Sequence, residues 1–281
     1  MDQALSFSLL AAVGLLIGIF SGLLGIGGGT VIVPVFRLAF GMSALASTAT
    51  SLFVIVPTSL AGAAARIRQK ACILPLGLAA GLGGALTSVA GVWLSSVSPA
   101  WLVMVVAAAV ITYSAATMLV QAARLKEARL VDGEPVAGGG PGSSGTAAGG
   151  GRLRLSPSQV AVGFPIGLAA GLVAGYIGVG GGFLMIPLMI AVLGVSMKEA
   201  SGASLVAMVI LAIPGVVGHA ALENIDFLAG IAVAAGSVPG AVIGARLVKR
   251  VPERALRFVF GGFLIVAAAL LVLNELGLWA K

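Results

Sequence analysis

The chain has 281 residues, of which 59% are hydrophobic and 9% are charged, and its mean hydropathy is +1.16. This composition excludes an ordinary soluble domain and indicates an all-α polytopic membrane protein. The net charge of +7 also occurs in nucleic-acid-binding proteins, but the sixteen Lys and Arg gather in short segments between apolar runs. That distribution is the positive-inside pattern of membrane proteins, so we expect membrane lipids and no nucleic acid as partners.

Ten apolar runs follow one another along the chain, five before and five after a glycine-rich segment. Most are close to the roughly 20 residues that a helix needs to cross a bilayer core of about 30 Å. Two are shorter, and at about 1.5 Å per residue they reach only partway. We expect about 8–10 membrane helices, with a glycine-broken helical hairpin in each half, and a full crossing of each hairpin stays open. The runs lie at 5–24, 30–40, 44–65, 71–94, 101–123, 160–177, 183–195, 201–221, 227–247 and 255–273.

Each short run follows a stretch of glycines, and the two stretches repeat. Gly25-Ile26-Gly27-Gly28-Gly29 returns as Gly178-Val179-Gly180-Gly181-Gly182, displaced by 153 residues. The same displacement aligns Pro34 with Pro187 and Ser51 with Ser204. The pattern predicts two transmembrane repeats at 1–123 and 159–281, joined by a flexible linker at 124–158.

The loop charges of the two halves alternate. Arg66, Arg68 and Lys70 are assigned to a loop whose counterpart, at 223–226, has no Lys or Arg, whereas the next loop is uncharged at 95–99 and basic at 246–254. The positive-inside rule then predicts two inverted-topology repeats, with the linker in the cytoplasm and both termini outside.

The consecutive glycines are candidates for an anion site. A helix that begins inside a membrane presents unpaired N–H groups and its positive dipole end, and glycine lets a ligand approach the main chain. Nearby hydroxyls can replace part of an anion's hydration shell. Close helix packing and capping by Ser and Thr are the alternatives. The candidate residues are Gly27, Gly28, Gly29, Thr30, Thr50, Ser51, Gly180, Gly181, Gly182, Ser201 and Ser204, with Ser47 and Thr48 beside them.

Some kinds of chemistry have no residues to carry them. The nine acidic residues fall in loops or at run ends, which argues against a cation carrier. His219, at a run end, is interpreted as a polar interface residue rather than a proton relay. With one His and one Cys, Cys72, we expect no metal site, no cofactor and no catalytic set, and therefore no enzyme.

Four segments resemble the sulfite exporter TauE/SafE family. They are Ser21 to Gly29 followed by Pro34, Ala174 to Gly182 followed by Pro187, Gly218 to Asp226, and Gly240 to Leu247. The resemblance implies export of a small anion, sulfite or an organosulfonate, across a bacterial inner (plasma) membrane.

Our hypothesis is a multi-pass transporter that binds this anion between its two halves and works by alternating access. The alternatives are a carrier or channel for another small solute or, from a different class, a membrane scaffold or an embedded enzyme. The sequence leaves open whether the chain forms a homo-oligomer.

Overall fold

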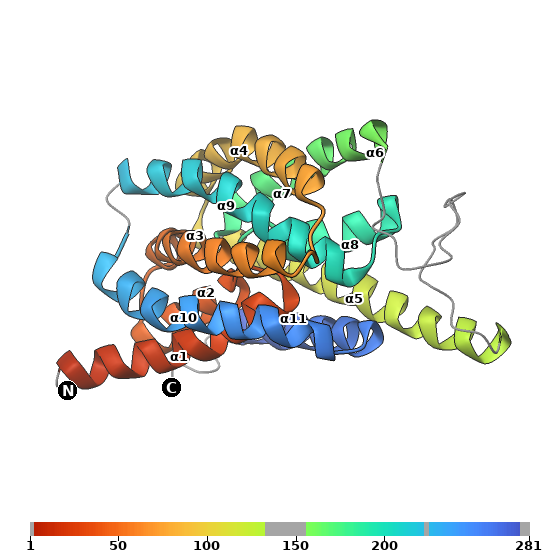
Figure 1. The fold of residues 1–281 in the computed structure, drawn as a ribbon. Coiled ribbons are helices and arrows are strands. Elements are labelled where there is room, and N and C mark those ends of the chain that lie inside the picture. The colour runs from red at the N-terminus through yellow and green to blue at the C-terminus, as the bar shows by residue number, and fades with distance from the viewer. Residues whose placement is uncertain (1–2, 133–155, 222–224, 276–281) are drawn as a thin grey trace.

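The computed structural model describes residues 3–132, 156–221 and 225–275, and every regular element in these ranges is a helix (Figure 1). Six helices among the described residues are long and apolar enough to cross a membrane, and two shorter apolar helices accompany them. The prediction of an all-α polytopic membrane protein is therefore confirmed. The first half contains α1 (Gln3–Leu24), α2 (Gly29–Phe40), α3 (Ala44–Arg68), α4 (Leu74–Val97) and α5 (Ala100–Asp132). The second half contains α6 (Pro157–Ala161), α7 (Gly163–Ile177), α8 (Gly182–Leu193), α9 (Met197–Ala221), α10 (Phe227–Leu247), the 3-10 helix η1 (Val248–Arg250) and α11 (Glu253–Glu275).

The sequence repeat is also a repeat of helices. The first residues of α2, α3, α4 and α5 reappear, displaced by the same 153 residues, as those of α8, α9, α10 and α11. The short arms α2 and α8 both have 12 residues, and each ends at a glycine with left-handed backbone, Gly41 or Gly194. The predicted linker overlaps the end of α5, which continues to Asp132, and its glycine-rich part lies outside the described residues.

Helix α1 of the first half packs against α10 of the second half, and α7 of the second half packs against α4 of the first half. Glycines bring these helices close, because a Cβ atom at Gly18 would lie 2.2 Å from the Ser237 carbonyl oxygen, and one at Gly171 would lie 2.2 Å from the Gly84 carbonyl oxygen. Along α1 and α10 the contacts advance together, as do those along α7 and α4, so each pair runs in the same direction. The contacts are Gly14, Gly18 and Gly22 with Val233, Ser237 and Ala241, and Gly167, Gly171 and Gly175 with Ala80, Gly84 and Ser88.

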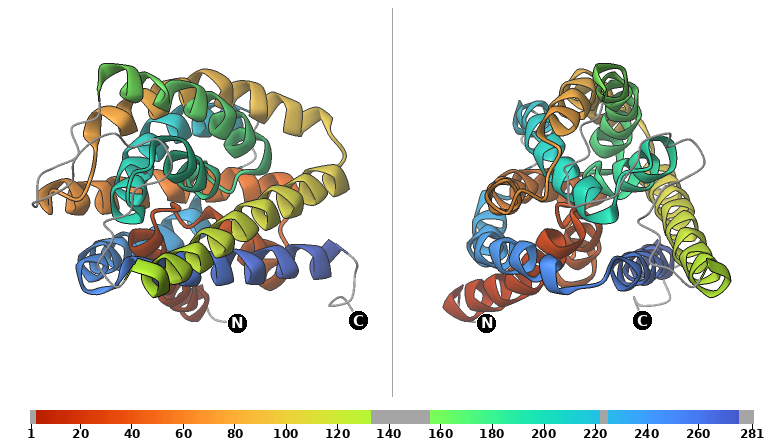
Figure 2. Two further views of the ribbon diagram at one scale, coloured as in Figure 1. Left: turned by 90° about the vertical axis from the view of Figure 1, so that its right-hand side faces the viewer. Right: turned by 45° about the vertical axis from the view of Figure 1, so that its right-hand side comes forward.

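Equivalent helices of the two halves run in opposite directions. At the centre, α3 and α9 cross antiparallel, since Gly62 lies near Leu205 and Gly215 near Leu52. Helix α10 runs parallel to α3, and the Thr58 and Ser237 hydroxyls join them at 2.6 Å. Helix α4 likewise runs parallel to α9. The described helices thus form one group of α1, α3 and α10 and an opposed group of α4, α7 and α9. Figure 2 shows α5 and α11 packed together beside these groups.

Basic residues gather where α3 and α10 end and where α9 begins. Arg68 and Lys70 lie at the end of α3, Arg250 lies at the end of η1, and Lys198 lies in the first turn of α9. We call this the basic end. The start of α11 is tied to it because a Glu253 carboxylate oxygen accepts a hydrogen bond from the Met197 N–H at 3.0 Å.

Candidate functional site

The two glycine stretches break the chain because their backbone leaves the right-handed region. Gly25, Gly27 and Gly28 have φ between 73° and 83°, which other residues rarely adopt, so α1 ends at Leu24 and α2 begins at Gly29. Gly28 packs against Ile17, seven residues before the end of α1. The chain has therefore folded back along α1, as the predicted hairpin requires.

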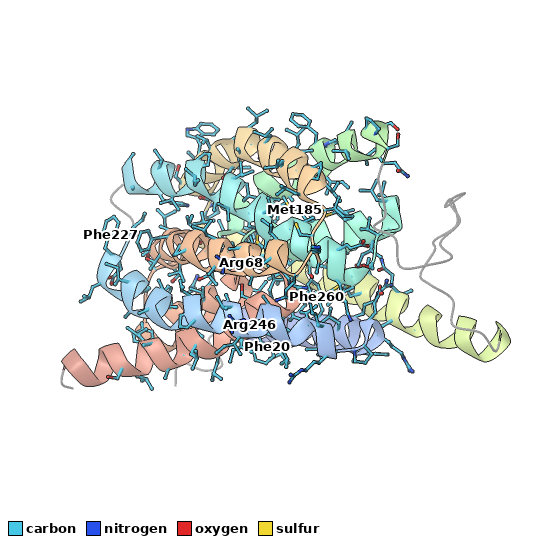
Figure 3. The ribbon with its side chains drawn as sticks, viewed as in Figure 1. Phe20, Arg68, Met185, Phe227, Arg246 and Phe260 are labelled. Carbon is cyan, nitrogen blue, oxygen red and sulfur yellow. The ribbon has the colours of Figure 1, made fainter. Side chains whose placement is uncertain are left out.

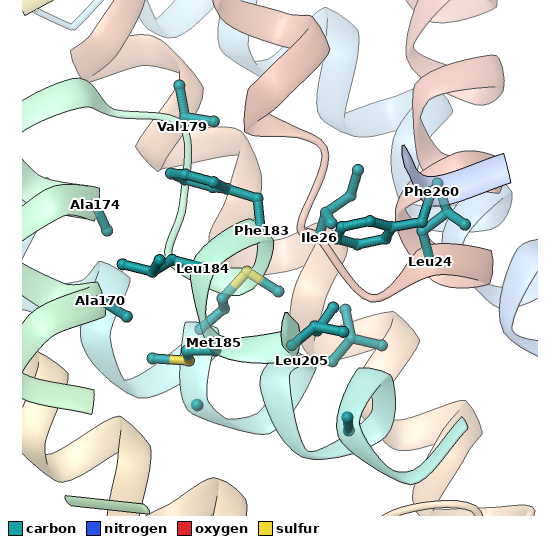
Figure 4. Close-up of a cluster of buried hydrophobic side chains, with 14 of the residues drawn as sticks. Leu24, Ile26, Ala170, Ala174, Val179, Phe183, Leu184, Met185, Leu205 and Phe260 are labelled. Carbon is teal, nitrogen blue, oxygen red and sulfur yellow. The ribbon is translucent and has the colours of Figure 1, made fainter. Parts of the chain in front are cut away.

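The two breaks contact each other in the interior. A Cβ atom at Gly29 would lie 2.2 Å from the Val179 carbonyl oxygen, and one at Gly182 would lie 2.7 Å from the Gly25 carbonyl oxygen. Ile26 and Val179, both fully buried, join the hydrophobic cluster shown in Figure 4. Side chains from the middle of α3 and α9, Ile55 and Met208, pack against both turns. The glycines therefore let two main chains meet where side chains would keep them apart.

Hydroxyl groups from α3 and α9 donate hydrogen bonds to the carbonyl groups at the ends of α1 and α7. The Ser204 hydroxyl donates to the Gly25 carbonyl at 2.7 Å, and the equivalent Ser51 hydroxyl donates to the Gly178 carbonyl. The Thr48 hydroxyl adds a bond to the Ile177 carbonyl at 3.2 Å. A helix end leaves its last carbonyls without intrahelical partners, and these hydroxyls from the opposite half satisfy them. Ser51 and Ser204 thus have a structural role at this junction.

Arg66 serves the same junction, and its assignment to a loop was wrong. It lies inside α3 and is fully buried. Its Nη2 group donates to the carbonyls of Gly22 at 3.1 Å and Leu23 at 3.0 Å, and to the Ser201 hydroxyl at 2.9 Å. A cation is favourable at the C-terminal end of a helix, here α1. The Nε and Nη1 atoms have no partner among the described residues.

His219 occupies the position equivalent to Arg66 in the second half. It lies in α9 and is fully buried, and both ring nitrogens lack a partner in the described part of the chain. The repeat pairs these two residues at its constant displacement. That pairing was the available signal that Arg66 belongs to a helix rather than to a loop.

Three buried hydroxyls surround the first glycine turn, and we call Ser21, Thr30 and Ser59 the hydroxyl cluster. All three side chains are fully buried, and none has a hydrogen-bond partner among the described residues. A Cβ atom at Gly27 would lie 3.2 Å from the Ser59 hydroxyl, and one at Gly28 would lie 3.6 Å from Ser21 Cβ. The equivalent residues around the second turn are Ala174, Phe183 and Ala212. The polar groups are therefore concentrated at the first turn.

The predicted residues separate into different places. Thr30 lies in the hydroxyl cluster, and the glycines of both stretches lie at the contact between the turns. Thr50 accepts a hydrogen bond from the Asp226 N–H at 3.0 Å, just before α10, and is thus engaged away from the turns. Ser21 and Ser59 were not predicted. Ser21 stands within the glycine-rich motif but before its break, and Ser59 has no polar counterpart in the repeat that would have marked it.

The electrostatics of this region favour a negative ligand. Among the side chains that the structure describes, no Asp or Glu is buried, and no group of three or more His, Cys, Asp or Glu could hold a metal ion. The buried Arg66 has no carboxylate partner in the described ranges. Helix α2 begins at Gly29, at the contact between the two turns, and the first N–H groups of a helix have no intrahelical partner. Neutral hydroxyls and helix N–H groups suit a small anion, and the buried Arg66 guanidinium at the end of α1 adds positive charge to the interior.

Comparisons with known proteins agree over nearly the whole chain. The family signature described as "Sulfite exporter TauE/SafE" matches residues 10–271. The chain is 29% identical over 243 residues to the "Probable membrane transporter protein YdhB" of Bacillus subtilis (strain 168), covering 86% of this chain and 90% of that protein. It is 26% identical over 289 residues to the "Probable membrane transporter protein YunE" of the same strain, covering 95% and 98%. No solved structure matches the chain.

Proposed function

The chain belongs to the sulfite exporter TauE/SafE family and is a membrane transporter, and we propose that it exports sulfite or an organosulfonate by alternating access. The family and the names of the relatives describe transport, so the expectation that the chain is not an enzyme is confirmed. The proposed setting is a bacterial inner membrane, with the basic end in the cytoplasm.

The hydroxyl cluster is the observation that carries this proposal. Buried hydroxyls normally have hydrogen-bond partners, and leaving one unsatisfied costs about 1–3 kcal/mol. Ser21, Thr30 and Ser59 come from three helices and approach one glycine turn without such partners. An oxyanion offers several acceptor oxygens and would satisfy all three, together with main-chain N–H groups at the start of α2.

The contact between the two turns suggests how binding and transport are coupled. In this structure each turn fills the space next to the other, with Gly29 against the Val179 carbonyl. An anion entering between the turns therefore requires the two opposed helix groups to shift. Because equivalent helices run in opposite directions, the packing supports inverted repeats, in which such a shift opens the turns to one side or the other.

A flux assay in proteoliposomes tests the proposal. Wild-type protein should move sulfite or a small sulfonate, and Ser59→Ala should lower the flux about 10-fold or more, because a hydrogen bond to a charged ligand contributes about 1.5–3 kcal/mol. Ser114→Ala is the matched control, since Ser114 on α5 is also fully buried and without a partner among the described residues.

The folded state of each variant is checked by size-exclusion chromatography. The proposed substrate is rejected if folded wild-type protein moves neither anion. The proposed site is rejected if Ser59→Ala and Ser114→Ala reduce the flux equally.

A further inference from the structure

A cavity of about 550 Å³ lies between α3 and α10 at the basic end. Arg68 and Gln69 contribute from α3 and the residue after it, and Arg246, Lys249 and Arg250 contribute from α10 and η1. Figure 3 labels Arg68 and Arg246 on these neighbouring segments. The cavity is separate from the glycine turns, because none of its lining residues belongs to them.

The lining of the cavity is amphiphilic. Ala61, Ala64, Ala65 and Val242 form an apolar part, and four cations form the remainder with Gln69. The salt bridge recorded among the described residues joins Arg257 to Glu253, so none of the four cations is neutralised by a described carboxylate. Four uncompensated charges around one cavity attract an anion strongly.

The cavity lies beside exposed apolar surface on α3 and α10. The stripe next to it on α3 carries Leu60 and Ile67, and the stripe next to it on α10 carries Ile243 and Leu247. Their side chains are 41–57% exposed, which suits lipid contact on helices of this length. A freely diffusing anion gains nothing from such flanks, whereas an acyl chain does.

We infer that this cavity binds the headgroup of an anionic phospholipid. The guanidinium and ammonium groups of Arg68, Arg246, Lys249 and Arg250 hold its phosphate, the alanines contact the glycerol region, and the acyl chains follow Leu60 and Ile243. Because the cavity joins the ends of α3 and α10, the bound lipid bridges the two helices within one of the opposed groups.

Native mass spectrometry of the full-length protein in detergent tests the inference, with phosphatidylglycerol as the probe. Arg68 and Arg246 line the cavity and can form charge-assisted hydrogen bonds to the phosphate, which residues outside the cavity cannot reach. The double variant Arg68→Gln/Arg246→Gln should therefore bind phosphatidylglycerol roughly 25-fold more weakly than wild type. Phosphatidylcholine has a headgroup without net charge. It should bind to the wild type at least as weakly as phosphatidylglycerol binds to the double variant.

The matched control is Lys198→Gln/Arg254→Gln. It removes one charge at the basic end and one at the adjacent start of α11, both outside the cavity, and should leave lipid affinity within about twofold of wild type. Inorganic phosphate, added in excess over the lipid, should not displace it. Equal losses of phosphatidylglycerol affinity in the two double variants would show that general surface charge, and not the cavity, attracts the lipid. Displacement by inorganic phosphate would make the cavity a vestibule for free anions instead, and either result overturns the inference.

Discussion

Gly25 and Gly178 are excluded from carrying a side chain for two independent reasons. Their φ values of 80° and 71° are strained for other residues, and the space that a Cβ would need is already filled. The filling residue comes from the opposite half in each case, Ser201 for Gly25 and Thr48 for Gly178. Backbone conformation and contact between the halves are therefore decided at the same positions.

Substitution of one of these glycines should destabilise the protein strongly. Gly25→Ala would place its Cβ atom 2.5 Å from Ser201 and is expected to lower the free energy of unfolding by more than about 2 kcal/mol. Gly262→Ala is the control, because Gly262 lies within α11 with no atom within 4 Å of the added carbon. It should stabilise by about 0.5–1 kcal/mol. Thermal unfolding in detergent measures both, and equal midpoints for the two variants would contradict the explanation.

The broken helix α1 ends within the protein, and its end is stabilised from elsewhere. The carbonyls of Gly22, Leu23 and Gly25 accept hydrogen bonds from Arg66 or Ser204, which lie on α3 and α9. Neither donor is local in sequence. The element therefore depends on tertiary contacts for groups that a longer helix would satisfy internally.

Loss of the Arg66 guanidinium should destabilise this junction. Arg66→Met removes the bonds to Gly22 and Leu23 and leaves two buried carbonyls unsatisfied, at an expected cost of about 2–4 kcal/mol. Arg66→Lys should lose less, because it keeps a cation at the helix end with fewer fixed donors. The control is Lys70→Gln, an exposed position outside the cavity, which is expected to unfold within about 0.5 kcal/mol of wild type. Denaturant unfolding in mixed micelles measures the free energy of unfolding of the three variants. An unchanged free energy of unfolding in Arg66→Met would refute the capping role.

At the scale of the whole molecule, the two halves exchange helices, so that each opposed group combines helices of both halves. Helix α1 packs on α10, and α7 packs on α4, so neither half forms a separate body. This exchange puts the ends of α3 and α10 together at the basic end, where positive charge of both halves accumulates. The loop between α4 and α5, around Ser98, lies at the other end because α4 runs opposite to α3.

Single cysteines at the two ends should report the predicted orientation. A membrane-impermeant maleimide should label Ser98→Cys in intact cells, and Lys249→Cys only after permeabilisation, because the basic end is expected inside. Burial raises the pKa of the native Cys72 thiol to about 11, so little of the reactive thiolate is present near pH 7.5 and background labelling should be slow. Cys72→Ser provides the blank. Labelling of both positions from the same side would disprove the opposed arrangement.

The lengths of the apolar runs and the spacing of the glycines determined the helices, the short arms and the pairing of equivalent residues, because helix formation in a membrane follows local hydrophobicity and backbone freedom. The same information predicted Thr30 as a site residue beside the first turn, and its binding role stays a prediction. It did not reveal that Arg66 is buried, that Thr50 is engaged by the Asp226 N–H, or that Ser21 and Ser59 approach Gly28 and Gly27. Those facts depend on which helix face meets which neighbour, in the case of Thr50 and Asp226 across 176 residues of chain. Only tertiary packing decides that, since a polar side chain in an apolar run has the same local sequence whether it caps a helix, contacts a ligand or faces another helix.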